Sequence, residues 1–231
     1  MSDSALAEDP IALSGDLLRS VRAGESPDFD ALAGLDPDAL DAALPTDAER
    51  LPFWLNVYNA VAIDTLRQHP GWYENRRTFF ARELVTVAGQ SLSLDDIEHG
   101  LLRRSQWKLG LGYIPNPFAG AFETRFRVDE VDPRIHFALN CGARSCPAIA
   151  VYTRDIDPEL DRAAEGYLQS EVEYDGTTAR VPRLLLWFRG DFGGGSGIRA
   201  MLRRYGLIPE DATPRIRYLP YDWTLKLDAF K

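Results

Sequence analysis

The order of apolar and polar positions predicts one long central helix with shorter helices and strands around it. Residues 51–68, LPFWLNVYNAVAIDTLRQ, are apolar on nearly every side of a helix, which is typical of a helix buried on all sides. Pro52 fits the first turn of this helix, where its missing N–H costs no hydrogen bond. Residues 9–22 and 27–43 repeat apolar side chains at helical spacing, so they predict two further helices, the second interrupted by a glycine and a proline.

The rest of the chain mixes short strands and helices in no regular order. Turn signals at Gly89 and at Asp175-Gly176 predict hairpins over 84–93 and 171–181. The other predicted elements are a helix over 94–104 capped by Ser93 and Asp96, a strand over 135–139, a helix over 158–169, a flexible glycine loop over 190–197, a helix over 198–205 and a strand over 216–219. This order predicts an α+β fold, with the central helix packed on a mixed or antiparallel sheet.

The charge of the chain is concentrated at one end. The net charge is −9, and the first fifty residues, with twelve acids and three arginines, account for all of it. We therefore expect an acidic helical extension over residues 1–49, which caps the protein or docks a protein partner, followed by a single domain over 50–231. The remaining residues balance acids and bases, so the charge gives no argument for a nucleic-acid partner.

Composition and the N-terminal sequence narrow the class of protein. Hydrophobic residues make up 45% and charged residues 26% of the 231 positions, which excludes a disordered or low-complexity chain. No basic and apolar leader opens the sequence, and no run approaches the ~20 apolar residues of a membrane span. We expect a soluble cytoplasmic protein without a membrane association, whose two cysteines are thiols.

Two amides lie on the otherwise apolar central helix. Asn56 and Asn59 are three residues apart and therefore share one side of that helix. A buried amide without partners costs roughly 1–3 kcal/mol. These side chains are expected either to tie neighbouring loops to the core or to line a binding site.

The chemistry-bearing residues gather in two segments. His136, Cys141 and Cys146 fall within eleven residues, and Glu98, His99 and Arg103 lie on the predicted helix over 94–104. A thiol nucleophile needs a nearby imidazole or helix N-terminus to lower its pKa, and a third group to orient that imidazole. The pattern thus predicts a thiol-dependent hydrolase or acyl transferase. Its candidate residues are Cys141 or Cys146 as nucleophile, His136 or His99 as base, Glu98 or Asp222 as orienting group, Asn140 as oxyanion donor, and Asn56, Asn59 and Arg103 as binding or orienting groups.

Other functions fit the same residues. His99, His136, Cys141 and Cys146 together would supply two nitrogen and two sulfur ligands, a set that zinc accepts, although no short Cys-x2–4-Cys knuckle is present. The thiol enzyme needs no cofactor. A reversible Cys141–Cys146 disulfide would make a redox switch. The cluster can also be purely structural, in a binding or scaffold domain.

Five stretches of the sequence resemble the family catalogued as domain of unknown function 547. They are FWLNVYNA (53–60), DDIEHGLLR (95–103), DPRIHFALNCGARSCP (132–147), DFG (191–193) and YLPYDW (218–223), and they span about residues 50–227. The resemblance implies that Asn56, Asn59, Glu98, His99, Arg103, His136, Cys141, Cys146 and Asp222 are characteristic polar positions, and it carries no established activity.

A fold-level analogy adds one expectation. Transglutaminase-like and papain-like folds run from a nucleophile helix to a strand with histidine and then to a strand or loop with an acid or amide. Asn56, His136 and Asp222 follow that order here, but the central helix has no cysteine. If this architecture is present, either the fold is reused without that chemistry or a thiol of the 141–146 loop replaces the usual nucleophile.

Overall fold

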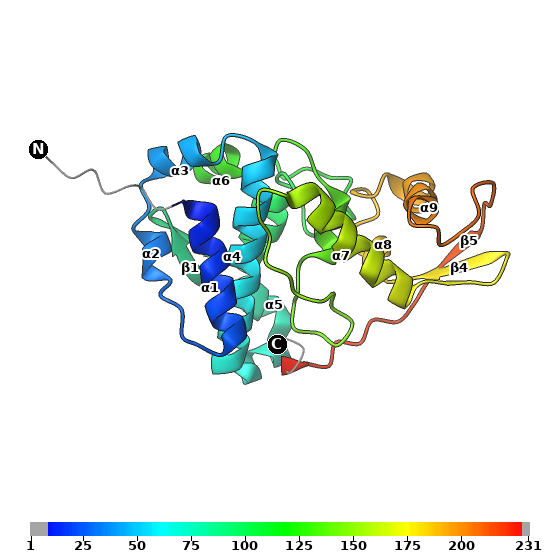
Figure 1. Ribbon diagram of the computed structural model, residues 1–231, viewed down its shortest axis with the longest axis horizontal. Coiled ribbons are helices and arrows are strands. Elements are labelled where there is room, and N and C mark those ends of the chain that lie inside the picture. Colours follow the sequence, from blue (N-terminus) through cyan, green and yellow to red (C-terminus); the bar gives the residue numbers. More distant parts are fainter. Residues whose placement is uncertain (1–8, 228–231) are drawn as a thin grey trace, which may run out of the picture.

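The structure, a computed structural model, describes residues 9–227 (Figure 1). Residues 1–8 of the predicted extension and residues 228–231 of the predicted domain lie outside this range. The α-helices are α1 (Pro10–Ala23), α2 (Asp30–Ala33), α3 (Pro37–Ala43), α4 (Asp47–Gln68), α5 (Arg76–Phe80), α6 (Ala121–Phe126), α7 (Ile156–Glu171), α8 (Leu184–Trp187) and α9 (Gly194–Arg204). The remaining elements are the 3-10 helices η1 (Pro70–Asn75) and η3 (Pro133–Phe137), the π-helix η2 (Asp96–Leu102), and the strands β1 (Glu83–Val87), β2 (Gln90–Ser93), β3 (Glu173–Tyr174), β4 (Thr178–Val181) and β5 (Arg215–Tyr218).

The predicted central helix is α4, and it is buried along most of its length. It begins four residues earlier than predicted, because Thr46 and Glu49 form a capping box that satisfies the first free N–H groups. Pro52 therefore lies inside the helix and not in its first turn. The start of α4 is thus set by a polar cap ahead of the apolar run.

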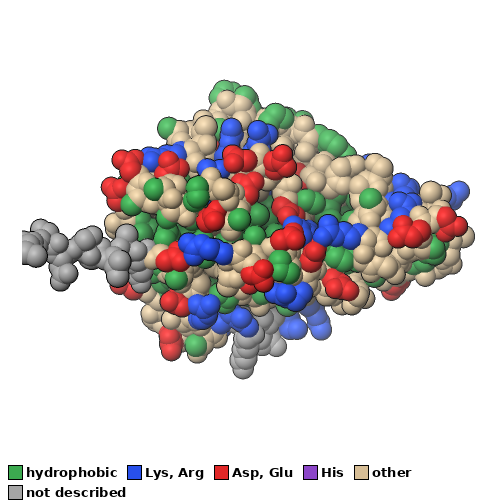
Figure 2. Space-filling view, turned by 45° about the horizontal axis from the view of Figure 1, so that its top comes forward, with side chains coloured by type: hydrophobic (Ala, Val, Ile, Leu, Met, Phe, Trp, Pro, Cys, Tyr) green, Lys and Arg blue, Asp and Glu red, His purple; other side chains and the backbone are tan. Residues whose placement is uncertain are grey.

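The two predicted N-terminal helices are present, with the expected break between α2 and α3. Helix α1 runs beside α4 (Figure 1), and Leu17, Leu18 and Val21 are buried in the same apolar core as α4. The acidic side chains of this segment stay at the surface. On the face of Figure 2, acidic and basic side chains are interspersed.

Two small sheets confirm the α+β class. β1 and β2 form an antiparallel hairpin, and the second sheet has the order β3-β4-β5, antiparallel between β3 and β4 and parallel between β4 and β5. Both predicted hairpins are therefore correct. Among the described residues, no helix combines the length and apolar character needed to cross a membrane.

Three predicted elements differ from the structure. The segment predicted as a strand over 135–139 contains the 3-10 helix η3, in which Pro133 occupies the first turn and Asp132 accepts from the N–H of Arg134. The predicted α-helix over 94–104 is mostly the π-helix η2; Ser93 and Asp96 exchange the expected hydrogen bonds around residues 94–95, the α-helical start of this segment. Helix α9 begins at Gly194, so part of the predicted flexible loop is helical.

The core has two parts that meet near the middle of the molecule. One surrounds α4 and includes α1, β1, β2 and η2, and the other joins α7, α8, α9 and β4. Ile135 belongs to the first part and Phe137 to the second, so η3 lies between them. In Figure 1, α4 lies on the side of the N-terminus, whereas β4, β5 and α9 form the opposite end.

Candidate functional site

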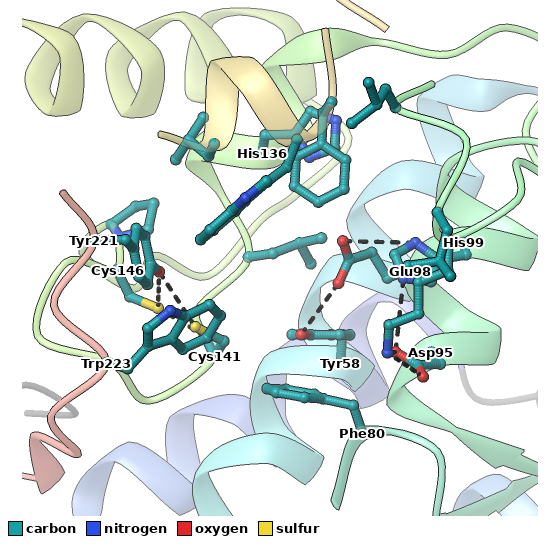
Figure 3. A pocket seen from close by; sticks show the side chains of 18 residues that line it. Tyr58, Phe80, Asp95, Glu98, His99, His136, Cys141, Cys146, Tyr221 and Trp223 are labelled. Atoms are coloured by element: carbon teal, nitrogen blue, oxygen red, sulfur yellow. Dashed lines mark hydrogen bonds and ion pairs between the residues drawn. The ribbon is translucent and has the colours of Figure 1, made fainter. Parts of the chain in front are cut away.

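A cavity of about 320 Å³ opens at the junction of the two parts of the core (Figure 3). This volume is within the usual range of small-molecule pockets, ~300–1,000 Å³. The walls are mostly apolar and aromatic, and the polar groups sit on opposite sides. The lining residues are Tyr58, Phe80, Asp95, Glu98, His99, Lys108, Leu109, Leu111, His136, Leu139, Cys141, Cys146, Pro147, Leu184, Trp187, Phe188, Tyr221 and Trp223.

The two cysteines lie together on one wall as free thiols. The Tyr221 hydroxyl oxygen is 3.4 Å from Sγ of Cys141 and 3.2 Å from Sγ of Cys146. The backbone N–H of Cys141 donates to Sγ of Cys146 at 3.0 Å. One phenol and one tight loop thus hold both sulfurs against the cavity.

The surroundings of the two sulfurs push their pKa values in opposite directions. The hydrogen bond from the Cys146 thiol, aided by Tyr221, lowers the pKa of Cys141 to about 7 against the effect of burial. Burial and the neighbouring Cys141 thiolate raise the pKa of Cys146 well above its ordinary value. Since two adjacent thiolates repel, the first proton leaves Cys141, and Cys146 stays a thiol that donates to it.

The opposite wall carries a carboxyl group, Glu98, whose side chain is 15% exposed (Figure 3). Burial raises the pKa of Glu98 to about 7, with Arg103 opposing and the negative charges of Asp95 and Cys141 adding to the rise. The Tyr58 hydroxyl donates to Oε2 of Glu98 at 3.5 Å. Near neutral pH this side chain is therefore close to half protonated, a state suited to general acid or base chemistry.

The π-helix η2 explains why two adjacent side chains, Glu98 and His99, both line the cavity. The N–H of Arg103 bonds to the carbonyl of Glu98, and that of Ser105 to Gly100, both five residues back. This wider winding reduces the angle between successive side chains, and such helices occur frequently at functional sites. Arg104 and Ser105 then adopt positive φ angles of 52° and 58°, a strained conformation for residues other than glycine.

A buried network of charged groups runs behind the π-helix. Arg103, whose side chain has no exposed surface, donates to the two carboxylate oxygens of Asp191 at 2.6 and 3.1 Å. His136 Nε2 donates to the same carboxylate at 2.8 Å, and Arg103 Nη1 donates to Nδ1 of His99 at 2.9 Å. Burial alone would raise the pKa of Asp191, but the hydrogen bonds from His136 and Arg103 lower it to about 2.

Burial favours the neutral state of both imidazoles. Burial lowers the pKa of His99 well below its ordinary value, and the Arg103 charge adds to this. Burial also lowers the pKa of His136, although Asp191 opposes the shift. Because Nδ1 of His99 accepts from Arg103, the proton of that ring is on Nε2, which lies 3.6 Å from Asp95.

His99 and His136 both line the cavity, but their hydrogen bonds go to Arg103 and Asp191 and not to the sulfurs. Within residues 9–227, neither thiol has a hydrogen bond to an imidazole nitrogen; the thiols bond to Tyr221 and to each other. Phe188 instead stacks on His136 at 3.9 Å, with the Arg103 guanidinium 4.6 Å from its ring centre. The predicted histidine base therefore lines the same cavity as the thiols, but among the described residues no hydrogen bond joins either imidazole to a sulfur.

The three predicted asparagines tie loops to the core. Asn56 bonds to both the N–H and the carbonyl of Tyr152, at 2.9 and 2.8 Å. Asn59 accepts from the N–H of Asn140 and donates to the carbonyl of Ala138, both at 2.9 Å. Asn140 donates to Pro147 and accepts from the N–H of Gly142, so its amide spans the cysteine loop. These bonds orient the loop that carries both sulfurs.

Asp222 holds the C-terminal segment and does not line the cavity. Its backbone N–H donates to the Ser145 hydroxyl at 2.9 Å, and its exposed carboxylate accepts from the N–H of Thr224. The neighbouring Tyr221 and Trp223 pack against Trp187, with ring centres 4.6 to 5.4 Å apart. This aromatic group keeps the Tyr221 hydroxyl on the two sulfurs.

The four predicted zinc ligands lie in two separate groups of hydrogen bonds. The sulfurs share Tyr221, whereas His99 and His136 bond to Arg103 and Asp191. In the part of the chain that the structure describes, no three side chains of His, Cys, Asp or Glu gather closely enough to hold a metal ion.

Sequence analysis assigned no role to three residues that complete the site: Tyr58, Asp191 and Tyr221. Asp191 stands in a glycine-rich turn, 88 positions after its partner Arg103, so no local pattern joins them. Two signals were available: an arginine on an apolar helix, which requires a buried acid elsewhere in the chain, and the place of Asp191 in the DFG stretch that resembles the family. Tyr58 and Tyr221 lie in two of the stretches that resemble the family, but residue type alone does not separate them from core tyrosines.

Comparison with known proteins identifies the family. The sequence profile of the family described as "Protein of unknown function, DUF547" matches residues 43–168, more than half of the chain. The match includes α4, η2 and the cysteine loop, whereas Asp191 and Tyr221 lie beyond it. No curated protein and no solved structure matches the chain. The chain therefore belongs to the DUF547 family, whose function is unknown.

Proposed function

We propose that this protein is a thiol-dependent acyl-transferring enzyme, a hydrolase or an acyl transferase, with Cys141 as its nucleophile. One observation carries the proposal: Cys141 and the Glu98 carboxyl face each other across a single apolar cavity (Figure 3). The Cys141 charge contributes to the raised pKa of Glu98, so the two groups interact through the cavity. A nucleophile and an acid–base group on opposite walls leave room for a substrate between them.

Cys141 is the better nucleophile of the two thiols. Its thiolate is stabilised by the Cys146 thiol and the Tyr221 hydroxyl, and its pKa of about 7 makes it about half ionised near neutral pH. Cys146 serves as a hydrogen-bond donor, since its own pKa is raised. In this proposal the predicted histidine base is replaced by a thiol–phenol pair.

The reaction has two steps. The Cys141 thiolate attacks the carbonyl carbon, the C–S bond forms, and the leaving group departs with the proton of Glu98. The Glu98 carboxylate then accepts a proton from water or an acceptor alcohol, thiol or amine, which attacks the acyl–sulfur bond and releases the Cys141 thiolate. The Tyr221 hydroxyl, freed when the C–S bond forms, is a donor available to the oxyanion.

The histidines keep positioning roles in this scheme. His99 Nδ1 lies 3.7 Å from Oε1 of Glu98, and Arg103 holds that ring in place. His136 stacks on Phe188, a cavity wall, and bonds to Asp191. We expect these groups to fix the orientation of Glu98 and of the wall without transferring a proton themselves.

Alkylation and acylation test the proposal. Iodoacetamide near pH 7 should label Cys141 much faster than Cys146, and Cys141→Ser should abolish the fast phase, whereas Cys146→Ser should retain labelling with an altered pH profile. Incubation with an activated ester should give an acyl adduct that mass spectrometry locates on Cys141. Glu98→Gln should retain adduct formation with a good leaving group but slow its hydrolysis. Equal, slow labelling of both native thiols, or no adduct, would exclude the proposed nucleophile.

The shared phenol favours a second candidate, reversible oxidation of the two thiols. With a hydroperoxide as oxidant, the Cys141 thiolate attacks the O–O bond to give a sulfenic acid and an alcohol or water. The Cys146 thiol then attacks that sulfur, and a disulfide and water form. Loss of two thiols per chain on peroxide treatment, prevented by Cys146→Ser and reversed by dithiothreitol, would support this function over acyl transfer.

A further inference from the structure

Exposed apolar side chains concentrate on one loop beside the cavity. Within residues 9–227, every large hydrophobic residue that is exposed lies between positions 107 and 118. Leu109 is 83% exposed and Phe118 is 81% exposed. Single exposed apolar residues are ordinary, but a cluster on one segment marks a surface that contacts an apolar ligand or partner. We call residues 107–118 the apolar loop.

Hydrogen bonds define the path of the apolar loop, so the fold itself keeps its side chains exposed. The N–H of Trp107 bonds to the carbonyl of Ile114 at 2.8 Å, and that of Gly190 to Leu111 at 2.6 Å. Leu111 adopts a positive φ of 51°, a conformation that costs a leucine energy. The fold thus holds these side chains in place at the surface.

The same loop forms a wall of the cavity. Lys108, Leu109 and Leu111 line it, together with Leu139, Leu184 and Trp187 on other elements. Apolar surface therefore continues from the outside of the molecule into the cavity that holds Cys141 and Glu98. A chain-like apolar group can lie along the loop while its end reaches the thiol.

The charges around the cavity disfavour an anionic ligand. Of the lining residues that the structure describes, Lys108 is the one lysine or arginine, and its ammonium already bonds both oxygens of Asp95 at 2.6 and 2.7 Å. Arg103 bonds to Asp191 and is fully buried. Among the lining residues that the structure describes, no unpaired cation is therefore left to neutralise a carboxylate or phosphate, whereas a neutral ester, thioester or amide needs none.

We propose that the site takes an uncharged acyl compound with a long apolar chain, which lies on the apolar loop while its carbonyl carbon meets Cys141. This inference rests on the proposed thiol-dependent acyl transfer, and it adds the substrate class. The ester or thioester bond at the carbonyl is the one that breaks, and the acyl group passes to Cys141.

Binding can be measured apart from catalysis. In Cys141→Ser, titration with methyl decanoate should change the fluorescence of Trp187 and Trp223, which line the cavity. Leu109→Asp should weaken this binding by about tenfold or more, and Leu109→Met should leave it nearly unchanged, because only the first removes apolar contact. The high exposure of Leu109 means that neither change disturbs the core.

Turnover supplies the second measurement. Wild-type protein should acylate Cys141 with para-nitrophenyl decanoate about tenfold or more faster than with para-nitrophenyl acetate, and Leu109→Asp should remove this preference. Equal rates with both esters and no binding of methyl decanoate would overturn the substrate class while leaving acyl transfer intact. Binding of methyl decanoate without any acyl adduct would overturn acyl transfer while leaving the chain-binding site. Loss of self-association in Leu109→Asp, with no ester binding in any variant, would assign the loop to a second copy of the chain.

Discussion

The guanidinium of Arg103 and the carboxylate of Asp191 form a two-bond ion pair with at most 1% of either side chain exposed. The pair joins the π-helix η2 to the turn before α9, 88 positions further along the chain. Each partner also bonds one histidine of the site: Arg103 bonds His99, and Asp191 bonds His136. Its integrity therefore decides whether the wall that holds Glu98 keeps its shape.

Asp191→Asn should destabilise the protein by about 3–5 kcal/mol, because it leaves a buried guanidinium without its counter-charge. Urea unfolding measures the loss. The exposed pair of Arg154 and Asp9 gives a matched control, in which Arg154→Ala should cost less than about 1 kcal/mol. Comparable losses in the two variants would contradict the structural importance of the buried pair.

Glu98→Gln should become progressively more stable than wild type as the pH rises from about 4.5 to about 7. Burial raises the pKa of Glu98 from 4.5 to about 7 in the folded protein, so the folded state holds its proton more tightly than the unfolded chain. The associated stability is full below about pH 4.5, is lost as the pH rises to about 7, and amounts to about 3 kcal/mol. Urea unfolding at about pH 5 and about pH 8 measures it. If the free energy of unfolding differs between variant and wild type by the same amount at both pH values, the pKa of Glu98 is not raised.

Tyr221→Phe should shift the pH midpoint of Cys141 alkylation upward by about one to two units. The Tyr221 hydroxyl lowers the pKa of Cys141, and a hydrogen bond to a charged group is worth about 1.5–3 kcal/mol. The rate of iodoacetamide labelling between about pH 5 and about pH 9 gives the midpoint. Tyr174→Phe is the control, because that hydroxyl bonds to Gly176 in a distant hairpin and should leave the midpoint unchanged.

Two glycine substitutions should change the stability of the protein in opposite directions. Gly112 has a φ of +80°, and a Cβ there would lie 2.2 Å from Oδ1 and 2.6 Å from N of Asp191, so Gly112→Ala should cost at least about 2 kcal/mol. Gly166 lies inside α7 with open space around it, and Gly166→Ala should stabilise by about 0.5–1 kcal/mol. Thermal unfolding compares them, and a neutral Gly112→Ala would mean that the apolar loop does not press against Asp191.

Sequence patterns predicted the parts of the fold that local chemistry determines. The spacing of apolar residues predicted α1 and α7, and the turn residues predicted both hairpins. Because buried amides need hydrogen-bond partners, bonds from Asn56 and Asn59 to neighbouring loops were one of the two expected outcomes. The segment 135–139 was mispredicted because His136 is buried like its neighbours, so the alternation there marks no solvent-facing side. Pro133 and Asp132 favour a turn instead.

Residue type singled out several of the polar groups at the cavity, but it predicted neither their arrangement nor the part of Tyr58, Asp191 and Tyr221. Both cysteines, His99, His136 and Glu98 were singled out by residue type, and all of them line one cavity. Their partners depend on long-range contacts: Tyr221 reaches Cys141 across 80 positions, and Asp191 reaches His136 across 55. The π-helix also escaped prediction, because its apolar spacing over a single short segment does not differ enough from that of an α-helix.

The route of the apolar loop depends on main-chain bonds and on two glycines in backbone contact with each other, Gly112 and Gly190. Side chains such as Leu109 take no part in these bonds, so they can be exchanged while the wall stays where it is. Under the proposed function, a different substrate preference would therefore require new side chains on this loop and no change in the thiol pair, the carboxyl or the buried ion pair.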